Sequence, residues 1–224
     1  MPIPRLIDVA EASGLIDEIG WFVLSRACDD LARLNAAAGP LYPVSVAVNV
    51  SMRQINRGTF VEDVQRTIAM HGVDPSLISP ELTETFLAAE PERALAMLTA
   101  LRAVGVRLEI DDFGTGYSSL GRLRLFPLDG LKIDRSFVAG LGDDPSAESL
   151  IATIVALAAA LGLEVTAEGI ECELQAEIVR DVGCDLGQGY HFARPAPVDE
   201  LVKLLAGRGG PERDAHMRTL PSGT

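Results

Sequence analysis

The feature that most constrains the fold is a strict alternation of apolar, strand-like runs with helical patterns. Six strand-like runs are present: Val44–Val50, Leu77–Glu84, Val106–Asp112, Gly130–Asp134, Leu163–Glu168 and Leu186–Phe192. Helical patterns cover Leu6–Ala38 (with a break near Ser13 and Gly14), Phe60–His71, Pro91–Val104, Ser118–Leu125, Ala147–Leu161, Glu171–Val182 and Val198–Leu205. Strands that alternate with helices pair in parallel through right-handed crossovers. The sequence therefore predicts an α/β fold with a parallel sheet.

The number of strands leaves two architectures open. A (β/α)₈ barrel needs eight strands, and nothing before Leu6 resembles one. A barrel built from these six would be incomplete, its missing strands would lie upstream of Met1, and its two edge strands could pair with another chain. A six-stranded doubly wound sheet is the alternative, although no GxGxxG turn supports it. Residues 3–205 are predicted to form one domain, and 207–224 a disordered tail.

Charge and cysteine content exclude several classes of protein. The net charge of −13 argues against binding to nucleic-acid polymers or anionic membranes, because both attract basic surfaces. No apolar run approaches the length of a membrane span. Three widely spaced cysteines, Cys28, Cys172 and Cys184, are typical of reduced thiols rather than of disulfides or a zinc site. We therefore expect a cytoplasmic protein or domain.

Polar side chains recur at the carboxyl ends of all six predicted strands, where parallel α/β folds form their sites. The most informative stretch is DDFGTGYSSL, in which two adjacent aspartates and a glycine-rich turn follow an apolar run. One acid at a strand end usually caps a helix, but a ring of acids would repel itself unless cations bound there. Oxygen donors without histidine favour Mg²⁺ or Mn²⁺ over zinc. The residues are Asn49, Glu81, Glu84, Asp111, Asp112, Lys132, Glu168, Glu171 and Gln188.

Five of these motifs carry a resemblance to a known family. ELTE, DDFGTGYSSL, LKIDRSFV, AEGIE and QGYHFARP, in this order and spacing, resemble the EAL-domain cyclic di-GMP phosphodiesterases. The helical stretch VAEASGLIDEIGWFVLSRAC resembles the one that follows the family's Glu-Ala-Leu signature. The resemblance implies a TIM-type (β/α)₈ barrel with one antiparallel strand and two Mg²⁺ or Mn²⁺ ions. It also implies hydrolysis of cyclic di-GMP to linear pGpG.

The resemblance also implies a role for each site residue. Asn49, Glu81 and Asp111 resemble ligands of the first metal, and Asp111 would bridge to a second ion held by Asp112 and Glu168. Lys132 resembles the residue that orients the attacking water, and with Glu168 and Glu171 it forms the predicted catalytic group. Glu84 resembles the glutamate that braces the DDFGTG loop. Gln188 lines the substrate site.

One departure from the family pattern bears on activity. The signature Glu-Ala-Leu, whose glutamate is a metal ligand, and an arginine that contacts the substrate have no counterpart in these 224 residues. The family places the signature on an upstream strand and the arginine shortly after it, and the two strands that the count above lacks are the two that the family places before this helical stretch. We therefore expect a truncated domain with impaired activity. The alternative is an inactive EAL-like module that binds cyclic di-GMP or a protein partner. The partners implied are cyclic di-GMP, a second copy in a homodimer, and sensory or diguanylate-cyclase-like domains on a longer parent chain.

Overall fold

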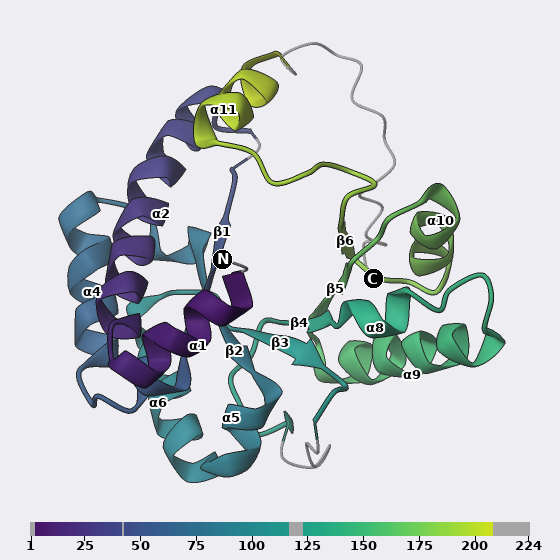
Figure 1. Cartoon of the computed structure of the whole chain (residues 1–224), viewed down its shortest axis with the longest axis horizontal. Coiled ribbons are helices and arrows are strands. Elements are labelled where there is room, and N and C mark those ends of the chain that lie inside the picture. Colours follow the sequence, from purple (N-terminus) through teal and green to yellow (C-terminus); the bar gives the residue numbers. More distant parts are fainter. Residues whose placement is uncertain (1–2, 42, 117–122, 208–224) are drawn as a thin grey trace, which may run out of the picture.

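In the computed structural model, six strands form one curled parallel sheet with helices packed outside it (Figure 1). The structure describes residues 3–41, 43–116 and 123–207. The strands lie side by side in chain order, each parallel to the next. A doubly wound sheet would reverse its order at a switch point, so the half-barrel prediction is confirmed and the alternative is wrong. The strands are β1 (Val46–Asn49), β2 (Ile78–Thr83), β3 (Glu109–Phe113), β4 (Gly130–Ile133), β5 (Glu164–Glu168) and β6 (Leu186–Gln188).

The longer helices follow the predicted pattern. The break near Gly14 is confirmed, and α4 and α6 have their predicted bounds. The long helices are α1 (Ile3–Ser13), α2 (Ile16–Ala38), α4 (Phe60–His71), α6 (Pro91–Val104), α9 (Pro145–Leu161), α10 (Glu173–Asp181) and α11 (Val198–Gly207). The helix predicted over Ser118–Leu125 lies largely outside the described residues, and so does the tail from residue 208. Gly207, predicted to begin that tail, is the last residue of α11.

Several short elements were not predicted. These are α3 (Met52–Ile55), the 3₁₀ turn η1 (Pro75–Leu77), α5 (Glu84–Ala89) and α8 (Arg135–Val138). The predicted strands are longer than the observed ones, and β2 and β6 illustrate this at their carboxyl ends. Glu84 is the first residue of α5 rather than the end of a strand, and β6 ends at Gln188 instead of Phe192.

The two faces of the sheet differ in polarity. Side chains alternate between the faces along each strand. One face carries apolar side chains that are buried in the core: Val48, Ile78, Leu82, Ile110, Leu131, Ile133, Val165 and Ala167. The opposite face carries mainly polar residues, among them Ser79, Glu81, Glu109, Lys132, Thr166 and Glu168. A sheet with this polar face presents charge to the hollow of the half-barrel rather than to a packed interior.

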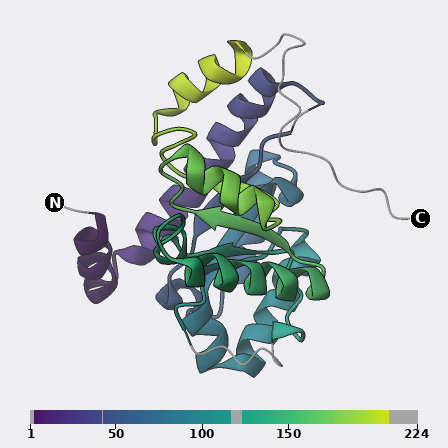
Figure 2. The same ribbon diagram turned by 90° about the vertical axis from the view of Figure 1, so that its right-hand side faces the viewer.

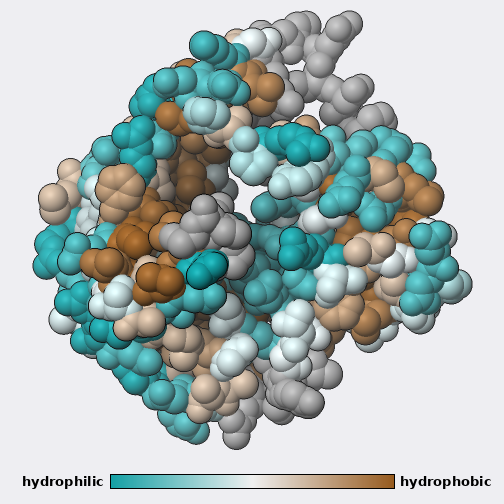
Figure 3. Space-filling model, viewed as in Figure 1, coloured by the Kyte–Doolittle hydropathy of each residue, from teal (hydrophilic) through white to brown (hydrophobic). Residues whose placement is uncertain are grey.

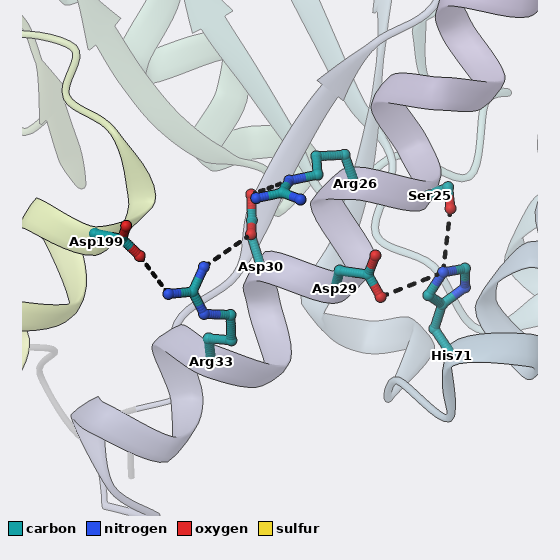
Figure 4. Close-up of polar contacts among 7 residues, drawn as sticks. All are labelled: Ser25, Arg26, Asp29, Asp30, Arg33, His71 and Asp199. Carbon is teal, nitrogen blue, oxygen red and sulfur yellow. Dashed lines mark hydrogen bonds and ion pairs between the residues drawn. The ribbon is translucent and has the colours of Figure 1, made fainter.

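Helix α2 contacts both α4 and α11 through polar side chains. Ser25 Oγ lies 3.1 Å from His71 Nε2, which also lies 3.5 Å from an Asp29 carboxylate oxygen (Figure 4). Arg33 forms ion pairs with Asp30 on its own helix and with Asp199 at the start of α11. These contacts agree with the views in Figures 1 and 2, in which α11 runs beside α2.

One prediction about α2 is wrong in part. The sequence alone predicts that Trp21 and Phe22 both lie in the core, because both belong to an apolar helical stretch. Trp21 is half-buried against Phe60, with ring centroids 5.9 Å apart, but Phe22 is 69% exposed. The buried stripe of α2 runs through Leu24 and Cys28, and two residues along a helix separate Phe22 from Leu24 by roughly 200°. Phe22 therefore lies on the outward side.

An exposed apolar patch covers α1 and α2. Figure 2 shows α1 projecting from the rest of the molecule, and Figure 3 shows apolar residues in brown over this region and hydrophilic ones mainly on the right-hand side of the central hollow. The exposed side chains include Leu6, Ile7, Val9, Leu15, Phe22 and Val23. Among the described residues, no helix has both the length and the apolar character needed to cross a bilayer.

Candidate functional site

The predicted site residues lie at or just beyond the carboxyl ends of the strands. Asn49, Glu168 and Gln188 are the last residues of β1, β5 and β6. In the sheet register, Asn49 pairs with Glu81, and Glu168 pairs with Gln188. Because parallel strands end at one edge, six separate stretches of sequence contribute polar groups to the same mouth.

A buried ion-pair triad forms the centre of this mouth. Lys132 Nζ lies 2.6 Å from Glu81 Oε1 and forms a second ion pair with Glu168. The side chain of Lys132 is 8% exposed and that of Glu81 is 3% exposed. Burial alone would lower the pKa of Lys132, but attraction to Glu81 and Glu168 raises it above the ordinary value. Lys132 therefore remains a fixed positive charge shared by two carboxylates.

Glu81 is the most perturbed carboxylate of the site. Burial raises its pKa to about 6, against the lowering effect of Lys132, and the nearby charges of Asp111 and Glu168 add to the rise. Among the described residues, its Oε1 atom has no hydrogen-bond partner of good geometry, although it forms the ion pair with Lys132. A buried carboxylate with unused acceptor capacity is suited to a further cation.

The raised pKa of Glu81 predicts how stability changes with pH when no metal is present. Between the unfolded value of 4.5 and the folded value of about 6, the folded state holds the extra proton. The free energy of unfolding should therefore fall as pH rises through this window, by about 2 kcal/mol. Urea unfolding in EDTA at pH 4.5, 5.5 and 6.5 measures this change. Glu81→Gln should abolish that slope, and an unchanged slope would contradict the assignment.

A β-bulge presents the aspartate pair. In the register of β3 with β4, Ile110 pairs with Leu131 and Phe113 with Ile133. Asp111 and Asp112 are thus two residues opposite one, Lys132, which is the pattern of a bulge. Asp112 has a φ of 54°, a left-handed conformation that no other described residue except glycines adopts. This conformation costs roughly 1–2 kcal/mol for a residue with a side chain, so surrounding contacts must hold it.

Glu84 supplies two of those contacts, as its predicted role requires. It is buried at the start of α5, and its Oε2 atom accepts hydrogen bonds from the backbone N–H groups of Gly114 (3.0 Å) and Gly116 (3.1 Å). Thr115 closes the turn, since its hydroxyl donates to the carbonyl of Asp112 at 2.8 Å. The glycine-rich turn is therefore attached to β2 through the residue that begins the next helix.

Asp134 belongs to the site but was missed in the sequence. Its side chain faces Asp112, and burial, Asp111 and Asp134 together raise the pKa of Asp112. Asp134 also caps α8, because its carboxylate accepts a hydrogen bond from the N–H of Ser136 at 3.0 Å. The Asp-x-Ser spacing is a helix-capping signal that could have identified both α8 and this contact.

The remaining predicted residues are Glu171, Asn49 and Gln188. Glu171 lies in the loop between β5 and α10, where its N–H donates to Gln175 Oε1 at 2.8 Å. It lines an open cavity of about 350 Å³ together with Arg135, Ser136, Ala139, Gly169 and Gln175. Asn49 and Gln188 are exposed. The structure thus brings Glu81, Lys132 and Glu168 into contact, with Asp111 and Asp112 close enough to influence them.

The donor chemistry fits hard divalent cations. Carboxylate oxygens and one amide are the ligands that Mg²⁺ and Mn²⁺ prefer. Within residues 3–41, 43–116 and 123–207, however, no three His, Cys, Asp or Glu side chains already form a group that could hold an ion. Lys132 instead contacts Glu81 and Glu168. The assignment of individual metal ligands stays a prediction.

Comparison with known families and curated proteins gives consistent matches. The EAL domain family matches residues 1–195. The chain is 40% identical over 201 residues to the cyclic di-GMP phosphodiesterase NbdA of Pseudomonas aeruginosa. This alignment covers 90% of this chain and 25% of NbdA. This chain spans only 25% to 32% of the length of the first curated relatives that it matches.

Solved structures show the same architecture. The PaMucR phosphodiesterase in complex with c-di-GMP is 38% identical, with a TM-score of 0.83 over 88% of this chain and 79% of that one. The manganese and cyclic di-GMP complex of Klebsiella pneumoniae BlrP1 is 29% identical, with a TM-score of 0.68 over 79% of this chain and 45% of that one. The half-barrel therefore corresponds to part of the EAL barrel.

Proposed function

The chain belongs to the EAL domain family, and from this premise we propose that it binds cyclic di-GMP and contributes the metal-dependent site that hydrolyses it to linear pGpG. The observation that carries the proposal is the convergence of Glu81, Lys132 and Glu168 at the carboxyl ends of β2, β4 and β5. A structural ion pair would not need two carboxylates on one buried lysine beside an aspartate, Asp112, in a strained conformation. A cyclic dinucleotide carries two phosphates. The carboxylates of this site could hold the cations that neutralise those phosphates, and Lys132 supplies a fixed positive charge beside them.

The roles proposed for the residues follow their positions. Asn49, Glu81, Asp111, Asp112 and Glu168 would hold two Mg²⁺ or Mn²⁺ ions, which when bound supply a water of lowered pKa and neutralise phosphate charge. Lys132 would orient that water and remain protonated. Glu84 holds the turn that carries the aspartates, whereas Glu171 and Gln188 would line the substrate path.

Binding of cyclic di-GMP tests the proposal directly. Calorimetry with Mg²⁺ or Mn²⁺ should detect binding to the 224-residue chain, and Asp111→Asn should weaken Mn²⁺ binding about tenfold or more, a loss of about 1.4 kcal/mol. The matched control is Asp143→Asn, because Asp143 is an exposed aspartate in the turn before α9. Equal effects of the two substitutions would contradict the site.

The cellular setting is also a proposal. Three free cysteines support a reducing, cytoplasmic compartment. A homodimer, and sensory or diguanylate-cyclase-like domains on a longer chain, remain predictions, as do the domain limits of 3–205. The apolar patch on α1 and α2 is the surface that a second polypeptide segment would cover.

A further inference from the structure

The turn after the aspartate pair has a second contact besides Glu84. Gly114 has a φ of +98°, and a Cβ atom placed on it would lie 2.8 Å from Cε2 and 2.9 Å from Cζ of Phe137. The edge of the Phe137 ring therefore packs directly against the Gly114 backbone, where no side chain could fit. The N–H of the same glycine donates to Glu84. The turn is thus held by a hydrogen bond and by an aromatic ring from two different elements.

The position of the ring is itself fixed to β4. Phe137 lies in α8, which starts two residues after the last residue of that strand. The Asp134 carbonyl accepts a hydrogen bond from the N–H of Phe137 at 3.1 Å, and its carboxylate caps the same helix. Phe137 is half-buried against the core, and the following residue, Val138, is fully buried. The short helix α8 therefore fixes the Phe137 ring relative to the end of β4.

We propose that Phe137 is a positioning residue, whose ring holds the Gly114 backbone so that Asp111 and Asp112 keep the bulged arrangement in which they lie opposite Lys132 in the sheet register. Without the ring, the hydrogen bonds of Glu84 and Thr115 would still restrain the turn, but the packing on Gly114 would be lost and the left-handed conformation of Asp112 would relax. The consequence for metal binding rests on the function proposed above, but the restraint on the turn does not.

Amide hydrogen exchange measured by NMR on the metal-free chain tests the restraint. In Phe137→Ala, exchange at the N–H groups of Gly114 and Gly116 should accelerate about tenfold or more relative to the amides of β5, because only the turn opens. Phe137→Leu, which keeps part of the volume, should give a smaller acceleration. The matched control is Phe126→Ala, a half-buried phenylalanine that precedes the amino end of β4, and it should leave the ratio unchanged.

Two results would overturn the proposal. One is an unchanged exchange ratio in both Phe137 variants, and the other is an equal acceleration in the turn and in β5, which would indicate general destabilisation only. As a second readout, Mn²⁺ affinity should fall in Phe137→Ala and partly recover in Phe137→Leu. If the wild-type chain binds neither Mn²⁺ nor cyclic di-GMP while the exchange prediction holds, the proposed function fails and the positioning role stands.

Discussion

Replacing Lys132 with methionine is expected to lower the free energy of unfolding at pH 7 by about 3 kcal/mol, the loss that follows when one partner of a buried ion pair is removed. Methionine keeps much of the length of the side chain, so packing changes little. Glu81 and Glu168 would then face each other without a cation. Because burial has already raised the pKa of Glu81 to about 6, Glu81 can take up a proton, and the loss should shrink at pH 5.

Urea unfolding followed by circular dichroism measures this effect. Lys203→Met is the matched control, since Lys203 is the chain's other lysine and is exposed on α11, and it should change stability by less than about 0.5 kcal/mol. The double variant Lys132→Met with Glu81→Gln should recover part of the loss. A similar loss in Lys132→Met and Lys203→Met would show that the triad does not stabilise the fold.

The order of the strands and the location of the site could be predicted because both follow from short-range patterns. Period-two apolar runs identify strands, and parallel pairing brings their carboxyl ends together. Glu81, Lys132 and Glu168 were therefore assigned to one mouth from sequence alone, and they are in contact. The role of Glu84 was implied by resemblance, and its hydrogen bonds to the turn agree with it.

Other features depend on three-dimensional packing and could not be read from the pattern. The bulge that sets Asp111 and Asp112 opposite one residue arises from the register of β3 and β4. Phe22 looked like a core residue because hydrophobicity does not reveal which side of a helix is covered. The contact of Phe137 with Gly114 joins residues far apart in the chain. Such contacts determine how the site residues are positioned, but no short sequence pattern predicts them.

The 224-residue chain by itself is expected to hydrolyse cyclic di-GMP at least about a thousandfold more slowly than a complete EAL phosphodiesterase. No Glu-Ala-Leu segment occurs in its sequence, so the carboxylate ligand and the substrate arginine that the family resemblance implies are missing from it. A two-metal site that lacks one charged ligand holds its ions less firmly, and about 4 kcal/mol of lost transition-state stabilisation corresponds to a thousandfold in rate.

Formation of pGpG with Mg²⁺ or Mn²⁺ is the measurement, with NbdA of Pseudomonas aeruginosa as the positive control. A chimera in which a Glu-Ala-Leu strand segment precedes Met1 should recover turnover, and Asp111→Ala in that chimera should abolish it again. Binding of cyclic di-GMP without turnover in the chimera would favour the regulatory module over the enzyme. Full turnover by the 224 residues alone would mean that the five proposed ligands, Asn49 among them, suffice for the metals, and our account of the missing ligand would be wrong.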